Sequence, residues 1–453
     1  MPTSAPQHEN THEHLRLLAD SLDSGALSLV KQQINDLHSA EIANLLESLP
    51  LKNRLIIWKL IEPELTGDIL VEVNDEVRSG LIKQTDDHDL IAAAGSLETD
   101  DLADIFDDLP DVVLHQLVRS MSNQDRRRLQ SVMAYDEDSA GGLMNPDMIS
   151  IRPNVNLDVV LRYLRQRGEL PSNTDKLFVV DKSDRFIGVL NISDLLTQGG
   201  KKSVADVMFT DEKALRPTLS DNEVASFFED YNLVSAAVVD DNNHLIGRIT
   251  VDDVVDVIRD EADRSLLSMA GLDEDDDMFA PVVRSAKRRA IWLGINLFTA
   301  FLAAWVIGLF SATIEQLVAL AVLMPIVASM GGIAGSQTLM LMIRGIALNQ
   351  IGKTNARWLL WKELAVGALN GMLWASVVGL ITGLWFQSVP LGLLIASAMM
   401  INLIAAAFAG ATIPLVLKRI NVDPALAGGV VLTTITDVIG FVSFLGLATI
   451  FLI

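Results

Sequence analysis

Residues 424–453 read PALAGGVVLTTITDVIGFVSFLGLATIFLI, an apolar stretch with a single ionisable side chain, Asp437. About 20 apolar residues in an α-helix cross the roughly 30 Å of hydrocarbon in a bilayer, so this stretch is long enough to span a membrane. An unpaired carboxylate near its middle costs several kcal/mol in lipid. The sequence therefore predicts a membrane helix in which Asp437 faces an aqueous path and binds a cation.

Two other interpretations of Asp437 stay open. Its carboxyl group could be neutral, or it could pair with Arg344, which lies near one end of another apolar stretch. Ionisable residues inside membrane helices are candidates for ion pathways by default, so we favour the cation site.

Four more apolar stretches lie upstream, at about 290–310, 317–343, 364–386 and 390–416. None shows the alternating strands, roughly ten residues long, of a membrane β-barrel, so each is predicted as a helix. We expect an all-α membrane domain at 289–453 with five spans. Because five helices are few to enclose a pore, a symmetric homodimer with the path between its subunits is predicted.

Polar residues in three spans extend the candidate ion path. Residues 331–338 read GGIAGSQT and residues 433–437 read TTITD, so hydroxyl, amide and backbone oxygens accompany the carboxylate. The glycines would equally permit close helix packing, and the two interpretations are compatible. The predicted pore site consists of Asp437, Thr433, Thr434, Thr436, Asn402, Gly332 and Gly335.

The available ligands indicate a hard cation. The chain has no Cys, and residues 281–453 contain no His, which disfavours Zn²⁺ and Cu⁺. One carboxylate per chain suits Mg²⁺, which keeps several of its waters when it binds to proteins. Ca²⁺, Mn²⁺ and Na⁺ remain open on these grounds.

Charge divides the chain into two parts. Residues 281–453 contain ten basic and four acidic side chains, a net charge of +6, and because the whole chain is −23, residues 1–280 carry −29. An acidic soluble part disfavours nucleic acid as a partner, because phosphate binding needs basic surface, and it favours cations.

Basic residues also predict the orientation in the membrane. Lys and Arg cluster before the first span, between the second and third, and after the fourth, whereas 311–316 and 387–390 contain none. We therefore expect the soluble half in the cytoplasm and the C-terminus outside, with the chain crossing the cell (inner) membrane and contacting lipid. The N-terminus lacks the apolar segment of a signal peptide.

The soluble half contains two internal repeats. Residues 41–50 (EIANLLESLP) match 101–110 (DLADIFDDLP) at an offset of 60, with apolar residues at helical spacing. This pattern predicts a superhelical stack of short helices. Residues 179–194 match 238–253 at an offset of 59, and each copy reads strand, turn, strand, helix.

The second repeat resembles a tandem pair of CBS domains with an α/β fold, covering 136–258. The sequence GRITVDD at 247–253 is similar to the motif with which such domains contact a nucleotide. The resemblance makes Thr250 and Asp253 candidate ligands of ATP, and in the first copy Asn191 stands in place of the Thr.

The layout of the whole chain resembles the MgtE family of magnesium channels and transporters. The strongest local matches are residues 136–144 (DEDSAGGLM), 250–258 and 423–440. The resemblance implies a homodimer, without enzymatic activity, that moves Mg²⁺ into the cytoplasm and binds it in the pore through Asp437. The implied domains are a helical N-terminal domain at 1–135, the CBS pair at 136–258, a connecting helix at 259–288 and the membrane domain at 289–453.

Regulation is implied as well. In this family cytoplasmic Mg²⁺ bound between acidic surfaces holds the channel closed, and a divalent ion between clustered carboxylates replaces repulsion with attraction. We expect the acidic run at 273–277 to be a solvated loop rather than a site. The predicted regulatory residues are Asp100, Asp101, Asp104, Asp252, Asp253, Asp256, Asp260 and Glu261.

Four positions depart from the family pattern. Ile333 stands where a Gly-Gly-Asn-x-Gly motif has Asn, and Asn232 stands where some members have Asp. Arg264 and Ser265 follow Glu261 where the family tends to be acidic. We expect Ile333 to affect ion preference, and the other three positions to make the regulatory sites fewer or weaker.

Rival functions remain. A secondary transporter of Mg²⁺, Co²⁺ or Mn²⁺ would use Asp437 as its H⁺- or Na⁺-coupling site. A nucleotide-sensing receptor would show no flux. An intramembrane protease would need a second catalytic residue at depth, and the spans contain no His. The chain has no Gly-x-x-x-x-Gly-Lys-Ser/Thr sequence, which disfavours a pump driven by ATP.

Overall fold

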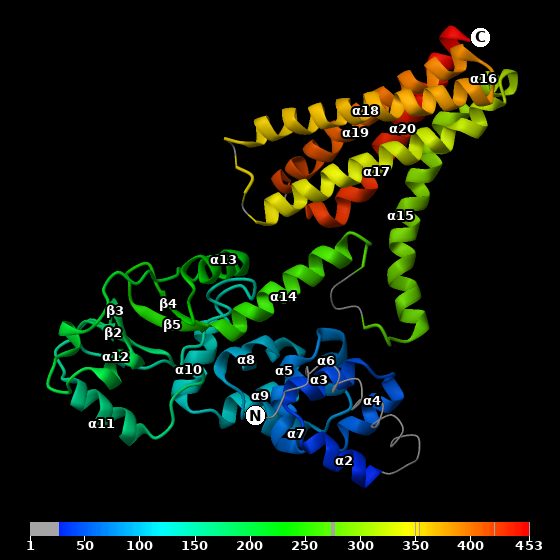
Figure 1. The fold of residues 1–453 in the computed structure, drawn as a ribbon. Helices are drawn as coiled ribbons and strands as arrows, with labels where there is room; N and C mark the ends of the chain where they lie inside the picture. The colour runs from blue at the N-terminus through cyan, green and yellow to red at the C-terminus, as the bar shows by residue number, and fades with distance from the viewer. Residues whose placement is uncertain (1–26, 273–276, 349, 353, 421, 453) are drawn as a thin grey trace, which may run out of the picture. The chain divides into compact units, whose positions relative to one another are not determined.

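A computed structural model describes the chain as two compact units (Figure 1). The first comprises residues up to 263 together with 275–281, and the second comprises 264–274 together with 282–453. The residues described are 27–272, 277–348, 350–352, 354–420 and 422–452.

Short helices form the N-terminal part of the first unit and confirm the predicted helical domain. Side chains of His38, Asn74 and Ser122 accept hydrogen bonds from the first turns of α3, α6 and α10, which fixes where these helices begin. One apolar core runs through the stack. Its elements are α2 (Leu27–Asn35), α3 (Ser39–Glu47), α4 (Leu51–Trp58), η1 (Pro63–Leu65), α5 (Thr66–Glu72), α6 (Asp75–Ile82), α7 (Asp87–Ala94), α8 (Thr99–Asp104), η2 (Phe106–Asp108), α9 (Asp111–Ser120) and α10 (Asn123–Val132).

Two copies of one α/β motif follow, as the second repeat predicts. In each copy two antiparallel strands pair with an irregularity at the same place, between Val179 and Val180 in the first and between Val238 and Val239 in the second. Strands β2 and β4 are buried along their whole length. The elements are β1 (Ser150–Ile151), α11 (Leu157–Arg167), β2 (Lys176–Val180), β3 (Phe186–Asn191), α12 (Ile192–Thr197), η3 (Val204–Asp206), α13 (Asp221–Tyr231), β4 (Ser235–Val239), β5 (Leu245–Thr250) and α14 (Val251–Ser268).

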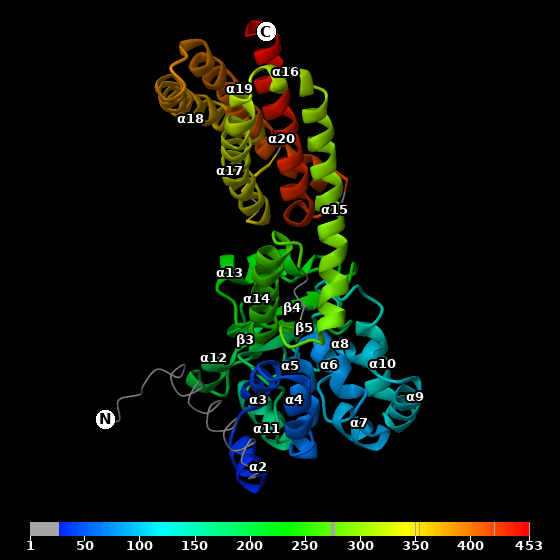
Figure 2. The same ribbon diagram turned by 90° about the vertical axis from the view of Figure 1, so that its right-hand side faces the viewer.

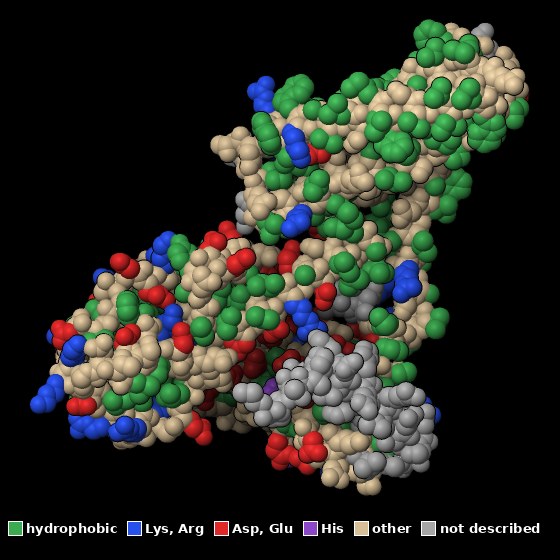
Figure 3. Space-filling view, viewed as in Figure 1, with side chains coloured by type: hydrophobic (Ala, Val, Ile, Leu, Met, Phe, Trp, Pro, Cys, Tyr) green, Lys and Arg blue, Asp and Glu red, His purple; other side chains and the backbone are tan. Residues whose placement is uncertain are grey.

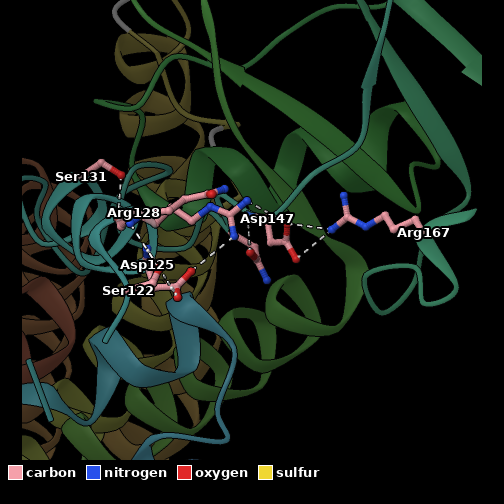
Figure 4. A network of polar contacts seen from close by, with 8 residues as sticks. Ser122, Asp125, Arg128, Ser131, Asp147 and Arg167 are labelled. Atoms are coloured by element: carbon pink, nitrogen blue, oxygen red, sulfur yellow. Dashed lines mark hydrogen bonds and ion pairs between the residues drawn. The ribbon is translucent and has the colours of Figure 1, made fainter. Parts of the chain in front are cut away.

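Polar contacts join the helical stack to the α/β motifs. Figure 4 shows Asp147, in the loop before β1, between two arginines: its Oδ1 accepts hydrogen bonds from Arg128 of α10 at 3.1 Å and from Arg167 of α11 at 3.2 Å. Glu98, just before α8, accepts a hydrogen bond from Ser172 at 2.6 Å. The Arg128 contact holds α10, and the Glu98 contact holds the start of α8, against the α/β motifs within the first unit.

A buried ion pair ties residue 277 to the N-terminal helices. Arg54 of α4 donates two hydrogen bonds to the Asp277 carboxylate, at 2.8 and 3.1 Å, and a third to the Leu46 carbonyl oxygen at 2.8 Å. Both side chains of the pair are at most 6% exposed. The expectation of a solvated acidic loop is therefore wrong for Asp277, because a partner 223 positions away buries it; 273–276 lie outside the described residues.

Removing this ion pair is expected to destabilise the first unit. Asp277→Ala leaves the Arg54 charge buried without a partner, which typically costs about 3–5 kcal/mol. Urea unfolding of the purified protein, followed by circular dichroism, measures the change in free energy of unfolding. The matched control is Asp75→Ala, which removes a carboxylate that pairs with Arg78 while 60% exposed and should cost about 1 kcal/mol or less. Equal effects of the two variants would contradict the prediction.

Among its described residues, the second unit contains five helices that are long and apolar enough to cross a membrane, which confirms the predicted spans. On its visible surface in Figure 3, apolar side chains are widespread and charged ones are few. Helices α17, α19 and α20 pack together (Figure 2), and their buried apolar side chains form shared clusters. The spans are α15 (Val282–Gly308), α17 (Ala319–Ala347), α18 (Ala356–Trp385), α19 (Val389–Arg419) and α20 (Pro424–Phe451), with a short α16 (Ser311–Gln316) after the first.

The region predicted as a connecting helix at 259–288 is not one helix. Helix α14 ends at Ser268, and α15 begins only at Val282. The Gly271 and Leu272 amides donate hydrogen bonds back to the Ser268 and Leu267 carbonyl oxygens, and Gly271 has φ +70°. Such a pattern is a glycine C-cap, which ends α14.

Candidate functional site

An open groove of about 500 Å³ lies between α17 and α20. Its wall on α17 runs from Ala328 to Met340, which is about three helical turns. These residues recur at intervals of three to four positions, so most of them share one face of the helix. The opposite wall, on α20, supplies the one carboxylate. The lining residues are Ala328, Ser329, Gly332, Ile333, Ser336, Gln337, Met340, Thr433 and Asp437.

Packing on the far faces of α17 and α20 turns these side chains toward the groove. Gly335 lies against Leu432, where an added Cβ atom would come within 2.8 Å of the leucine side chain. Thr436, next to Asp437 in sequence, is fully buried. Because Thr436 points into the helix bundle, Asp437 is rotated by about 100° onto the groove side.

Three of the seven predicted pore residues line the groove: Asp437, Thr433 and Gly332. The other four are not among the residues that line it. The Thr434 hydroxyl donates to the Val430 carbonyl oxygen at 2.7 Å, and the Thr436 hydroxyl donates to the Thr433 carbonyl oxygen at 3.0 Å. Gly335 and Asn402 are buried in helix contacts.

Several lining residues were absent from the predicted pore set. Ser329, Ser336, Gln337 and Met340 all lie on the same face of α17 as Gly332. Their helical spacing from Gly332 was the signal that could have identified them. Ile333, the departure from the family motif, also lines the groove and is 56% exposed there.

A second cluster of carboxylates lies in the first unit, where α8 approaches the start of α14. Asp100 interacts electrostatically with Asp253 and Asp101 with Asp252, so four predicted regulatory residues come together. Asp68, Glu72 and Glu98 also act on this cluster; the prediction did not include them. Nothing local in the sequence associates α5 with α8. We call Asp68, Glu72, Glu98, Asp100, Asp101, Asp252 and Asp253 the acidic interface.

Burial and mutual repulsion raise the pKa values of three carboxyl groups in the acidic interface, which favours their protonated forms. Burial, then Asp253 and Asp101, raise the pKa of Asp100 to about 8. Burial and Asp252 raise the pKa of Asp253 to about 7, and burial and Glu98 raise the pKa of Asp101 to about 6. One oxygen of Asp100 accepts no hydrogen bond from any residue that the structure describes. A bound divalent cation would relieve this repulsion.

The remaining predicted regulatory residues lie around the acidic interface. Burial and Glu72 raise the pKa of Asp256. Asp104 interacts with Asp101, Glu137 and Arg78. Asp260 and Glu261 lie about two turns further along α14, and Glu261 accepts a hydrogen bond from Asn222 at 3.3 Å. Across the described ranges, no three or more Asp, Glu, His or Cys side chains are already arranged to hold a metal ion.

The two residues of the nucleotide motif lie together at the start of α14. The Thr250 amide and hydroxyl donate hydrogen bonds to the Asp253 carboxylate at 3.2 and 3.1 Å. In the first copy, Asn191 donates to Asp194 at 3.2 Å, so the amide takes the place of the hydroxyl. In the second copy the bond from the Thr250 amide to Asp253 satisfies a backbone donor at the start of α14.

Three family models match the chain in order along its length. The model described as "MgtE intracellular N domain" matches residues 37–138, and the CBS domain model matches 140–199 and 204–260. The model "MgtE", described as a divalent cation transporter, matches residues 324–447.

Named relatives are similar to this chain over nearly its whole length. The magnesium transporter MgtE of Bacillus subtilis is 28% identical over 95% of this chain and 96% of its own. The magnesium transporter MgtE of Thermus thermophilus is 27% identical over 96% and 98%. A crystal structure of the cytosolic domain of the Mg²⁺ channel MgtE in complex with ATP is 27% identical, with a TM-score of 0.49, and covers 53% of this chain and 98% of its own.

Proposed function

Because the chain belongs to the MgtE family of divalent cation transporters, we propose that it is a Mg²⁺ channel that admits Mg²⁺ to the cytoplasm. The groove between α17 and α20 is the observation that carries this proposal. It brings one carboxylate, three hydroxyls and an amide to one surface of a largely apolar helix bundle. Whole-length similarity to proteins named magnesium transporters supports the choice of ion.

The chemistry of the lining suits a hydrated Mg²⁺ ion. Asp437 supplies the charge, and Ser329, Ser336, Gln337 and Thr433 supply neutral oxygens for the ion's water ligands. Mg²⁺ gives up water reluctantly, so a single carboxylate with hydrogen-bonding neighbours is a fitting site. The thioether of Met340 is too soft a ligand to compete for it.

We propose that two copies of the chain enclose the path. The groove is open along one side of the single chain, and a two-fold axis beside α17 and α20 would close it with a second, identical groove. Two Asp437 carboxylates would then face one path. The basic residues at the ends of the spans put the soluble unit in the cytoplasm under the same proposal.

The acidic interface is proposed as the regulatory site. High cytoplasmic Mg²⁺ would bind among Asp100, Asp101, Asp252 and Asp253, hold α8 to α14 and close the pore. Low Mg²⁺ would let the carboxylates separate. Limited proteolysis of the purified protein across a Mg²⁺ titration tests this, with protection expected as Mg²⁺ rises. Identical digestion with and without Mg²⁺ would exclude the mechanism.

ATP is proposed as a second cytoplasmic ligand, contacting Thr250 and Asp253. Both residues lie where β5 meets α14, the position at which the motif predicts nucleotide contact. Isothermal titration of ATP into the protein, with Thr250→Val as the comparison, tests the assignment. The Val variant should lose binding; equal binding by both proteins would refute it.

Mg²⁺ uptake into proteoliposomes at fixed voltage tests channel activity against a coupled carrier. A channel gives uptake that follows the Mg²⁺ gradient and does not change when a pH or Na⁺ gradient is imposed. Uptake that tracks either imposed gradient would support the secondary transporter instead. Uptake no faster than in protein-free liposomes would contradict transport altogether.

Two adjacent threonines provide a sharp test of the groove. Thr433 lines it and Thr434 does not, although both hydroxyls donate to backbone carbonyl oxygens of the preceding turn. We expect Thr433→Val to slow Mg²⁺ uptake about three- to tenfold, since one hydrogen bond is worth roughly 1 kcal/mol, and Thr434→Val to leave it within about twofold. The reverse order would place the path on another face of α20.

A further inference from the structure

Asn402 on α19 lies outside the groove but contacts both helices that form it. Its side chain is 1% exposed. Its Nδ2 atom donates a hydrogen bond to the Val327 carbonyl oxygen of α17 at 2.9 Å. The same amide nitrogen is the nearest atom that side chains at Gly331 of α17 and Gly440 of α20 would meet.

The two glycines allow α17 and α20 to close around this amide. A Cβ atom at Gly331 would lie 2.2 Å from Asn402 Nδ2, and one at Gly440 would lie 2.8 Å from it. Neither distance can be reached without moving a helix or the amide. The Asn402 amide therefore fills the space between the two helix backbones at this level.

Stability alone does not account for an amide here. Apolar residues surround it, including Leu403 beside it and Val327 across from it. Among the described residues, none donates a hydrogen bond to its Oδ1 atom. A buried, unsatisfied oxygen is unfavourable, and an apolar side chain would avoid that penalty.

Each backbone that Asn402 touches belongs to a wall of the groove. Val327 and Gly331 directly precede the lining residues Ala328 and Gly332. Gly440 lies about one turn beyond Asp437 on α20. A change in the spacing at Asn402 therefore changes the width of the groove beside the Asp437 carboxylate.

We propose that Asn402 is a positioning residue that sets the separation of α17 and α20. This separation in turn determines the preference for Mg²⁺ over Ca²⁺, an inference that rests on the proposed transport of Mg²⁺ through this groove. Mg²⁺ requires near-ideal octahedral geometry at short distances, whereas Ca²⁺ accepts six to eight ligands in flexible arrangements. A groove of altered width disfavours the more demanding ion.

The experiment compares uptake of Mg²⁺ and of Ca²⁺ into proteoliposomes by the wild type, Asn402→Ala, Gly331→Ala and the double variant. We expect Asn402→Ala to lower the ratio of Mg²⁺ to Ca²⁺ uptake at least about threefold. Gly331→Ala should slow Mg²⁺ uptake about tenfold or more, and adding Asn402→Ala should recover a large part of it, because the smaller side chain removes the clash. Asn370→Ala, at an exposed Asn of α18, is the matched control and should leave the ratio unchanged.

A distance measurement keeps the proposal testable if a variant transports poorly. The chain has no Cys, so spin labels can be placed at Leu341 of α17 and Val442 of α20, both exposed. The distance between them should shift in Asn402→Ala and return toward the wild-type value in the double variant. If Asn402→Ala cannot be purified, the same measurements are made on Asn402→Ser.

The outcomes separate this inference from the proposed function. If the uptake ratio and the label distance are both unchanged in Asn402→Ala, but Asp437→Ala abolishes uptake, the positioning role is wrong and the proposed function stands. Normal uptake by Asp437→Ala overturns the proposed function itself. Lack of recovery in the double variant overturns the claim that the Asn402 amide sets the spacing.

Discussion

Asp437→Ala is expected to slow Mg²⁺ uptake into proteoliposomes by at least about 30-fold. A unit charge and a divalent cation about 5 Å apart attract by roughly 7 kcal/mol at an effective dielectric constant of about 20. If the barrier to permeation rises by even about 2 kcal/mol of this, the rate falls about 30-fold. Asp437 is the only carboxylate among the residues that line the groove, so no neighbour in the described chain replaces it.

Asp437→Asn and Asp437→Glu make the test specific for charge. The Asn variant keeps the size and loses the charge, so it should behave like Ala. The Glu variant keeps the charge on a longer side chain and should retain measurable uptake. Thr434→Val serves as the control on α20, because Thr434 lies about one turn from Asp437 and does not line the groove. A rate of Mg²⁺ uptake by Asp437→Asn equal to that of the wild type would contradict the assignment of Asp437 to the pore.

In the absence of Mg²⁺, the first unit is expected to lose stability as the pH rises from about 6 to 8.5. The pKa values of Asp101, Asp253 and Asp100, about 6, 7 and 8, all lie above the ordinary 3.8. For an acid with a raised folded-state pKa, the folded state holds a proton that the unfolded chain has released. The contribution of these three carboxyl groups to stability is therefore greatest below about pH 4 and is lost as the pH rises through their folded-state pKa values.

Mg²⁺ should reverse this trend, because it stabilises the ionised carboxylates and competes with their protons. Thermal unfolding of the purified protein with EDTA or with Mg²⁺ measures both effects. We expect the Mg²⁺-induced rise in Tm to be larger at pH 8.5 than at pH 6. A rise that does not depend on pH would show that Mg²⁺ binds elsewhere.

Asp100→Asn isolates the acidic interface. Because it removes a buried charge, it should stabilise the Mg²⁺-free protein at pH 8 by about 2 kcal/mol, equivalent to about 4–8 °C in Tm. It should also reduce the effect of Mg²⁺. Asp36→Asn, at an exposed acid of the same domain, is the control and should change neither quantity. Destabilisation by Asp100→Asn in EDTA would contradict the electrostatic account.

Local sequence patterns were sufficient to predict the spans, the repeats and the residue that carries charge into the membrane. Runs of apolar residues decide membrane insertion because the cost of burying polar groups in lipid acts on each segment alone. For the same reason Asp437 was conspicuous without any knowledge of its neighbours. The strand–turn–strand–helix repeat was likewise visible, because both copies keep the same local pattern at a constant offset.

The face that each helix presents depends instead on how the whole chain packs. Thr433, Thr434 and Thr436 are equivalent by composition, yet only Thr433 lines the groove, because packing against α17 and α19 fixes the rotation of α20. The same packing turns Asn402 away from the groove and against two glycines. Asp277 meets Arg54, and Glu72 meets the acids of α8 and α14, through contacts between residues far apart in sequence. Local patterns carry no information about such contacts, because distant segments meet only in the folded chain.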